Sequence, residues 1–193
     1  VTMDARDYDF TSLSTCQDSN GYPLKKQTSE IVFIERCLQL LKPGGTLGIV
    51  IPKSIATNNN LQTSRAALSK LGYIYAVMSL PPETFASTGT QTTTIVLFAR
   101  KYKNAKEAAE PTNIALATID NVGFDSTGRK RPGSKLPDFA KMTTRAIEEE
   151  KSQKFIELIP YQNKAATFKQ LSNLFITKSQ NKNDVLLGDL CDF

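Results

Sequence analysis

Four cations stand close together in the stretch STGRKRPGSK, at residues 126–135: Arg129, Lys130, Arg131 and Lys135. Gly128 and Gly133 lie among them, and glycine lets a backbone approach a ligand closely. A loop of this composition is typical of contacts to phosphate groups, which supply much of the affinity of proteins for nucleic acids. The alternative is a solvated surface loop, and the sequence leaves both interpretations open.

The rest of the composition excludes several kinds of catalytic site. The 193 residues include no histidine, which excludes a Ser-His-Asp triad, a Cys-His dyad and any zinc site with a histidine ligand. The net charge of +5 is compatible with a nucleic-acid partner but does not establish one.

The cysteines and the hydropathy pattern indicate the cellular compartment. Cys16, Cys37 and Cys191 are odd in number and far apart, so we expect small buried or incidental thiols and no disulfide framework. No apolar run reaches the roughly 18–20 residues that cross a bilayer, and no secretory signal precedes the fold. A reducing cytoplasm is therefore the expected compartment.

The candidate residues depend on an α/β framework that positions them. Apolar residues recur at helical spacing over residues 29–42. Pro43 cannot continue this helix, and Gly44 or Gly45 supplies a positive φ at its end. The stretch TLGIVIP, residues 46–52, is short and continuously apolar, which is typical of an interior strand covered on both faces, as in a parallel sheet.

The chain continues with a second helix over residues 60–71 and strands over residues 73–80 and 92–100. Only a short connector joins the two strands. A parallel crossover needs about a dozen residues or more, so we expect antiparallel pairing. Lys53 follows the strand 46–52 at its carboxyl end, where α/β sheets bind ligands, and it is a candidate for facing a ligand there.

The two ends of the chain are expected to differ from this framework. Residues 1–28 are polar and rich in turn formers, which predicts a long surface loop. Residues 113–120 predict another strand, and residues 138–155 and 164–175 predict amphipathic helices. We therefore divide the chain into a loop over residues 1–28, an α/β domain over 29–138 and a mostly helical extension over 139–193.

Three longer strings follow one another in a characteristic order: SEIVFIERCLQLLKPGGTLGIVIPKSI, LPPETFASTGTQTTTIVLFARK and VGFDSTGRKRPGSKLPD. In this order they resemble the modification (M) subunit of type I restriction systems and related adenine-N6 DNA methyltransferases. The resemblance covers residues 29–138 well and the remainder loosely. Even the final residues, LLGDLCDF, resemble the segment that opens a target-recognition domain in specificity subunits.

The resemblance implies a Rossmann-like, seven-stranded sheet that binds S-adenosylmethionine. In the family, a glycine-rich cofactor loop follows the first strand, and an Asn/Asp-Pro-Pro-Tyr/Phe catalytic motif follows the fourth. The chain contains neither, because its one Pro-Pro pair lies in LPPE, residues 80–83. We therefore expect the chain to hold the last three strands, to begin after the active site and to stop before the DNA-reading domain.

The resemblance also implies roles for the connector between the last two strands. Phe85 is a candidate apolar wall for a flipped adenine, and a core phenylalanine is the alternative. Thr88, Gly89, Thr90 and Thr92 can contact base or phosphate through hydroxyls and backbone N–H groups, or they only form a turn. Lys53 is a candidate contact to DNA or cofactor.

Two functions therefore stay open. In the first, the chain is part of a site-specific adenine-N6 DNA methyltransferase and is inactive alone, with no catalytic residue, no metal and no cofactor of its own. The complete enzyme would use S-adenosylmethionine. Its partners would be double-stranded DNA, a specificity subunit or target-recognition domain, and the missing N-terminal half. In the second, it is a non-catalytic basic α/β module that binds DNA or a restriction-system subunit.

Overall fold

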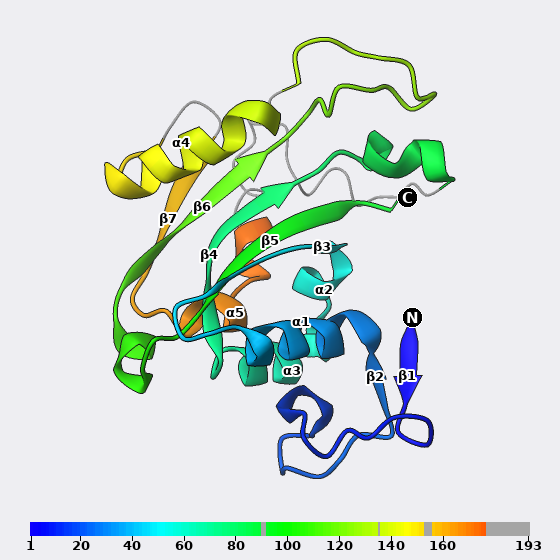
Figure 1. The fold of residues 1–193 in the computed structure, drawn as a ribbon, viewed down its shortest axis with the longest axis vertical. Coiled ribbons are helices and arrows are strands. Elements are labelled where there is room, and N and C mark those ends of the chain that lie inside the picture. Colours follow the sequence, from blue (N-terminus) through cyan, green and yellow to red (C-terminus); the bar gives the residue numbers. More distant parts are fainter. Residues whose placement is uncertain (90–91, 135, 153–155, 177–193) are drawn as a thin grey trace.

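The computed structural model describes residues 1–89, 92–134, 136–152 and 156–176. Five strands form one mixed sheet in the order β3–β5–β4–β6–β7 (Figure 1). Their bounds are Thr46–Pro52 for β3, Gly72–Ser79 for β4, Thr94–Lys101 for β5, Thr112–Thr118 for β6 and Ile156–Tyr161 for β7.

Strand β5 lies between β3 and β4 and is antiparallel to both, which confirms the predicted pairing. The connector between β4 and β5 is too short for a crossover, so the chain reverses direction there. Strand β4 is parallel to β6, and β6 is antiparallel to β7. Strands β3, β4 and β6 therefore run in the same direction, and their carboxyl ends meet at one edge of the sheet.

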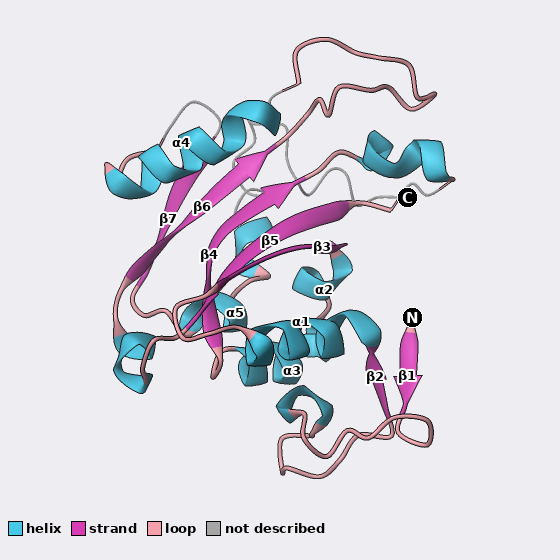
Figure 2. Cartoon of the chain, in the orientation of Figure 1, coloured by secondary structure: helices cyan, strands magenta, loops and turns pink. Residues whose placement is uncertain are grey.

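Helices cover both faces of the sheet (Figure 2). One core cluster packs the sheet against five helices: α1 (Ser29–Leu40), α2 (Ser54–Thr57), α3 (Gln62–Leu68), α5 (Ala166–Lys169) and α6 (Asn173–Ile176). A second cluster packs the other face against α4 (Leu136–Glu148). No helix among the described residues is long and apolar enough to cross a membrane.

Helix α1 ends close to the predicted position. Gly44 has a φ of +76°, as expected for the turn after a helix. The ammonium of Lys101 donates to the carbonyls of Gln39 and Leu41, each at 2.8 Å. A β5 side chain thus satisfies carbonyls that the end of α1 leaves without an intrahelical partner. The helix predicted over residues 60–71 is shorter, and consists of the 3₁₀ turn Asn59–Leu61 followed by α3.

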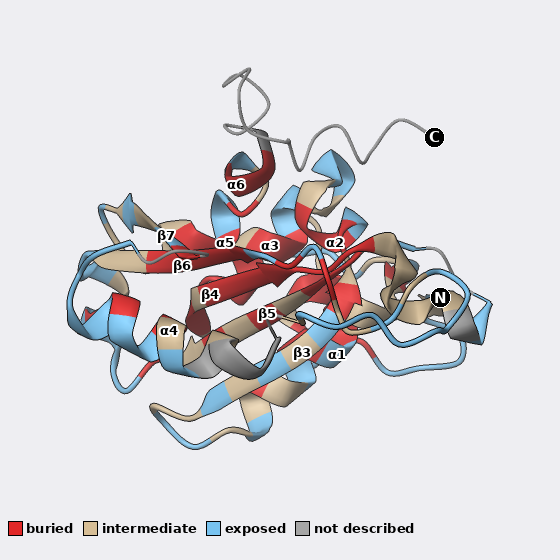
Figure 3. Cartoon of the chain, turned by 90° about the horizontal axis from the view of Figure 1, so that it is seen from above, coloured by how far each residue is buried: buried red, intermediate tan, exposed pale blue. Residues whose placement is uncertain are grey.

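The prediction that residues 46–52 form an interior strand is wrong for the described chain. Strand β3 lies at the edge of the sheet. Its Leu47, Ile49 and Ile51 pack into the first core cluster, but Val50 on the opposite face is 50% exposed. Figure 3 shows exposed residues along β3. Helix α4 contacts β6 and β7 and leaves this part of the sheet uncovered.

Residues 1–28 are more ordered than the predicted surface loop. The strands β1 (Thr2–Asp4) and β2 (Lys26–Thr28) pair antiparallel, and Ser14–Cys16 form a 3₁₀ turn. A third core cluster of Phe10, Leu13, Cys16 and Val32 lies between this segment and α1. The buried carboxylate of Glu35 on α1 accepts four hydrogen bonds from this segment, given by the backbone N–H and hydroxyl groups of Ser14 and Thr15. A helix residue distant in sequence therefore orders the segment.

The region after residue 138 also departs from the prediction. Helix α4 ends at Glu148, and β7, which was not predicted, adds an edge strand to the sheet. The helix predicted over residues 164–175 is split into the short helices α5 and α6. The hydroxyl of Thr167 on α5 accepts from the Ile74 N–H of β4 at 2.9 Å, so α5 is bonded directly to the sheet. The LLGDLCDF segment lies outside the described residues.

Candidate functional site

The sheet brings three of the predicted segments to one edge. Segments that begin at Lys53, Leu80 and Ile119 follow β3, β4 and β6, which are mutually parallel. Backbone hydrogen bonds continue between strands at this edge, with Lys53 N–H donating to Thr93 and Ile119 N–H donating to Ser79, each at 3.0 Å. The carboxyl edge of parallel strands is where α/β sheets bind ligands.

The segment after β3 is held from within the protein. Lys53 is buried, and its ammonium lies 5.3 Å from the centroid of the Phe175 ring. The buried guanidinium of Arg65 on α3 donates to the carbonyls of Ile55 and Asn58, at 3.1 and 2.9 Å. Burial lowers the pKa of Arg65. Lys53 reaches the predicted edge, and its contact with DNA or cofactor stays a prediction.

The connector after β4 forms a 3₁₀ helix, η3, over Pro82–Thr88. Phe85 is half-buried on this helix. The hydroxyl of Thr88, which is exposed, donates back to the Phe85 carbonyl at 2.7 Å. Gly89 ends the helix in the left-handed region, with a φ of +80°, and Thr92 is exposed. Thr90 lies outside the described residues.

The basic loop after β6 is a small hairpin. Phe124 pairs with Lys130 in an isolated antiparallel bridge. The carboxylate of Asp125 accepts from the Thr127 hydroxyl at 2.7 Å and from the backbone N–H groups of Thr127 and Arg129, each at 2.9 Å. These bonds hold the pKa of Asp125 below its ordinary value, and the bond from the Thr127 hydroxyl has the largest effect. The turn is thus fixed by an anionic side chain inside the basic sequence.

The hairpin presents its cations outward. Arg129, Lys130 and Arg131 are exposed, whereas Lys135 lies outside the described residues. Asn121 anchors the base of the hairpin, since its amide donates to the Pro132 carbonyl at 2.7 Å and accepts from the Gly123 N–H at 2.8 Å. The Gly- and Pro-rich sequence predicted a loop, but it gave no sign that Asn121 and Asp125 would shape it.

The connector and the basic hairpin lie on two sides of one small cavity. A small cavity of about 180 Å³ lies between them, lined by Glu83, Thr84, Phe124, Asp125 and Gly128. Two of the segments singled out from the sequence therefore share one surface at the carboxyl edge. Lys53 does not line this cavity.

The chemistry available on this surface is that of hydrogen bonding and positive charge. It holds the exposed hydroxyls of Thr88 and Thr92, the glycine backbone and the cations of the hairpin. Within the described ranges, no group of three or more His, Cys, Asp or Glu side chains is placed to hold a metal ion. Such a surface suits contacts to phosphate or to base edges.

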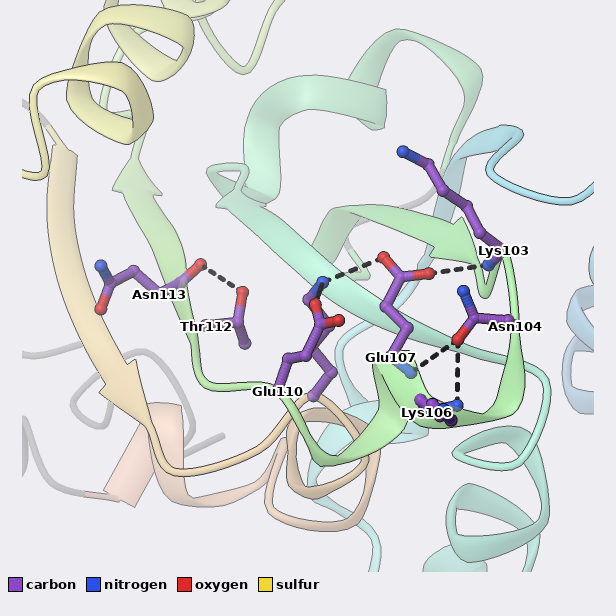
Figure 4. A network of polar contacts seen from close by, with 8 residues as sticks. Lys103, Asn104, Lys106, Glu107, Glu110, Thr112 and Asn113 are labelled. Carbon is purple, nitrogen blue, oxygen red and sulfur yellow. Dashed lines mark hydrogen bonds and ion pairs between the residues drawn. The ribbon is translucent and has the colours of Figure 1, made fainter.

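A partly buried charged cluster at the opposite edge was not predicted. Lys164 donates to Glu107 and Glu110, each at 2.9 Å, and its ammonium lies 4.6 Å from the centroid of the Tyr73 ring. Glu107 also accepts from the Lys103 N–H at 2.7 Å (Figure 4). The two carboxylates come from the turn between β5 and β6, and Lys164 lies more than fifty residues later in the sequence. No short motif connects such positions.

A family model described as N-6 DNA Methylase matches residues 9–183, which include all five strands and both segments at the carboxyl edge. The chain belongs to the N-6 DNA methylase family. The match confirms the resemblance drawn from the three strings, and it extends that resemblance over the N-terminal segment and the region after residue 138.

Solved structures share the fold of this N-6 DNA methylase family member. The type I restriction-modification methyltransferase subunit from Streptococcus thermophilus matches with a TM-score of 0.57 and 19% identity, over 91% of this chain and 34% of that one. A chain of another type I restriction-modification system matches with a TM-score of 0.55 and 18% identity, over 79% and 32%. The EcoKI M protein matches with a TM-score of 0.50 and 17% identity, over 66% and 28%.

These relationships confirm the predicted α/β fold of the methyltransferase type, and this chain spans about a third of the length of those structures. Among curated proteins, the Defense against restriction protein B of Escherichia phage P1 is 34% identical over 70 residues, which are 36% of this chain and 3% of that protein.

Proposed function

We propose that this chain is the C-terminal part of the catalytic domain of a site-specific adenine-N6 DNA methyltransferase of the type I M-subunit kind. The observation that carries the proposal is the β3–β5–β4 arrangement, with antiparallel β5, in a chain that matches the N-6 DNA methylase family. The connector and the basic hairpin lie together at the ligand-binding edge of that sheet.

The chain is inactive alone in this proposal. Methyl transfer to an exocyclic amine is mainly a positioning problem, which needs ligands for the cofactor and for the flipped base. No two glycines in the sequence stand two residues apart, as a glycine-rich cofactor loop requires, and Pro81-Pro82 is followed by Glu83 rather than by an aromatic residue. The described residues therefore do not fit S-adenosylmethionine, which the complete enzyme would bind through its other half.

The missing N-terminal half would dock on β3. The sequence of β3 is that of a strand covered on both faces, yet β3 is an edge strand with Val50 exposed. Phe33 and Leu40 on the adjacent α1 are 60% and 85% exposed. An open edge with apolar residues on both sides is suited to the addition of another strand. A strand added to this edge would make β3 an interior strand, and the elements that accompany it would cover Val50.

The connector and hairpin would contact double-stranded DNA. Phe85 would form an apolar wall beside a flipped adenine, and Thr88, Gly89, Thr90 and Thr92 would donate to base or phosphate. Arg129, Lys130, Arg131 and Lys135 would contact phosphates. A specificity subunit or target-recognition domain would select the sequence. The cytoplasm is the compartment in which such an enzyme meets DNA.

The test is reconstitution with an upstream polypeptide of the same family that carries the glycine-rich loop and the Asn-Pro-Pro-Phe motif. With labelled S-adenosylmethionine and unmethylated DNA, we expect methyl transfer only when both polypeptides are present. Calorimetry of this chain alone should show no S-adenosylmethionine site tighter than about 100 µM, roughly −5.5 kcal/mol. A tighter stoichiometric site, or methylation by this chain alone, would contradict the proposal.

The exposed cations of the hairpin also support a second function, that of a non-catalytic basic module that binds DNA or a restriction-system subunit. The reconstitution distinguishes the two functions. A module of this kind would bind DNA or the subunit without adding to methyl transfer by any upstream polypeptide.

A further inference from the structure

A cavity of about 770 Å³ lies on the face of the sheet that α4 covers, at the edge opposite the connector and hairpin. Its floor is formed by β4, β5 and the first residues of β6, and its walls by α4 and the end of β7. Nothing in the proposed methyltransferase function uses this cavity.

A β-bulge shapes the floor. The register between β4 and β5 shifts between Ile74 and Ala76, so Tyr75 and Ala76, although consecutive, both pack on the α4 face. A bulge re-aims side chains in this way and often lies beside a binding site. The shift brings the Tyr75 ring into the cavity next to Phe98 of β5.

Aromatic rings form one side of the cavity. Phe98 and Phe139 are stacked, with ring centroids 5.6 Å apart and ring planes inclined by 27°. Tyr75 lies against Phe98 with centroids 6.1 Å apart. Aromatic walls of this kind favour a flat, ring-containing ligand, because offset stacking and edge contacts add to the burial of apolar surface.

Two polar side chains line the same cavity with a buried donor atom that has no partner. Arg100 of β5 has its guanidinium carbon 5.4 Å from the centroid of the Tyr75 ring, and its buried Nε has no hydrogen-bond partner among the described residues. Thr143 of α4 is only 6% exposed, and its Oγ1 also has no partner in the described chain. Buried polar atoms are normally hydrogen-bonded, so these two indicate an absent acceptor.

The charged residues around the cavity limit the negative charge that a ligand can carry. The cations are Arg100 and Lys164, and Lys164 is already paired with Glu107 and Glu110. Glu148 and Glu150, both exposed, line the cavity as well and repel additional negative charge. One anionic group can be accommodated at Arg100, whereas a polyanion such as a nucleic-acid backbone is disfavoured.

We propose that this cavity binds a flat aromatic monoanion, with its ring against the wall formed by Tyr75, Phe98 and Phe139 and its anionic group accepting hydrogen bonds from Arg100 Nε and Thr143 Oγ1. The ring and the acceptor are required together, because the aromatic wall and the unpartnered donors lie in one cavity.

The test is calorimetry of the full chain with 2-naphthoate, a carboxylate, and with 2-naphthalenemethanol, its uncharged counterpart. We expect stoichiometric binding of 2-naphthoate and at least tenfold weaker binding of the alcohol. Arg100→Gln should weaken 2-naphthoate binding at least tenfold, and Thr143→Val several-fold. Arg100→Lys keeps the charge but lacks the Nε donor, so it should fall between wild type and Arg100→Gln.

The control is Arg145→Gln, which removes an exposed arginine of the same helix that does not line the cavity. Its 2-naphthoate binding should equal that of wild type. Circular dichroism establishes that each variant is folded, and Thr143→Val and Arg100→Lys test the site if Arg100→Gln does not fold. No binding of 2-naphthoate to the wild type, equal binding of the alcohol, or equal loss in Arg145→Gln would overturn the proposal.

Discussion

The backbone N–H of Lys53 donates to the carbonyl of Thr93 at 3.0 Å, one step beyond the last register pair of β3 and β5. This bond places the end of β3 beside the start of β5 at the carboxyl edge. The two strand ends differ in exposure. The Lys53 side chain after β3 is buried against the Phe175 ring, whereas Thr92 before β5 is exposed. The groups that can meet a large ligand here come from the connector and the hairpin.

Replacement of Arg129, Lys130 and Arg131 by alanine is expected to weaken binding of the reconstituted enzyme to all DNA sequences about equally. Each lost phosphate contact lowers the slope of log K against log salt by about 0.9, so the slope should flatten by up to about three units. Fluorescence anisotropy at several salt concentrations measures both quantities.

The control is alanine at Lys42, Lys70 and Lys106, three exposed cations next to the amino ends of β3, β4 and β6. This variant has the same net charge as the first but keeps the carboxyl edge intact, so its salt slope should match that of wild type. An unchanged slope in the hairpin variant would make the loop a solvated surface. A selective loss for one target sequence would mean that these residues read bases.

The framework of the fold could be predicted because its signals are local. Apolar periodicity located α1, β3, β4 and β5, and the length of one connector decided that β5 is antiparallel. The parallel direction of β3, β4 and β6 then placed the connector and hairpin at one edge. The cavity shared by η3 and the hairpin was not predictable, since it brings together residues about forty positions apart.

The remaining differences come from distant partners. Glu35 orders Ser14 and Thr15 from another element, so a polar segment that reads as a loop becomes part of the core. Thr167 on α5 meets the sheet at Ile74, and the helix predicted over residues 164–175 is broken between α5 and α6. In both places, tertiary contacts override the local secondary-structure propensity. The cavity under α4 depends on a β-bulge, and nothing in the sequence around Tyr75 predicts that bulge.

Gly89→Ala is expected to lower the free energy of unfolding by about 1 kcal/mol, because an L-residue at a φ of +80° is strained. A Cβ at this position would meet no atom within 4 Å, so strain is the only structural cost. Chemical denaturation measures the loss. The variant should also weaken DNA binding by the reconstituted enzyme, since the chain around Gly89 is proposed to approach DNA.

Gly21→Ala is the matched control. Gly21 has a φ of +84° and equally open surroundings, but it lies in the N-terminal segment, away from the carboxyl edge. The two variants should lose similar stability, and only Gly89→Ala should affect DNA binding. Equal DNA affinity for both variants would remove Gly89 from the proposed interface.

The ion pairs of Lys164 should make stability depend on pH at both extremes. Burial alone would raise the pKa of Glu107, but the Lys103 N–H and the Lys164 ammonium outweigh it and hold that pKa below 4.5. Burial alone would lower the pKa of Lys164, but its bonds to Glu110 and Glu107 raise it above 10.5. The stabilisation is therefore present between about pH 4.5 and 10.5, and is lost as the pH falls below or rises above that range.

Lys164→Met tests this dependence. At pH 7 it should lower the free energy of unfolding by up to about 3 kcal/mol, since it leaves Glu107 nearly buried without its cation. The difference from wild type should shrink as the pH falls below 4.5 and through the lowered pKa of Glu107, where this carboxylate is protonated. Arg145→Met, which breaks an exposed pair with Glu149, should cost less than about 1 kcal/mol. Denaturation curves from pH 3 to pH 11.5 measure both, and a constant difference for Lys164→Met would contradict the assignment.

Val50→Lys is expected to leave this chain folded and to prevent its assembly with the upstream half. Val50 is half exposed on the uncovered face of the edge strand β3, so a lysine there can reach solvent in the chain alone. In the assembled domain the same position would be covered, and a buried unpaired ammonium is strongly unfavourable.

Tyr22→Lys, which changes another exposed apolar residue in the N-terminal segment, serves as the control. Thermal unfolding should show both variants close to wild type, while co-purification with the upstream polypeptide should fail only for Val50→Lys. If Val50→Lys assembled normally and supported methyl transfer, the missing half would have to dock elsewhere than on β3.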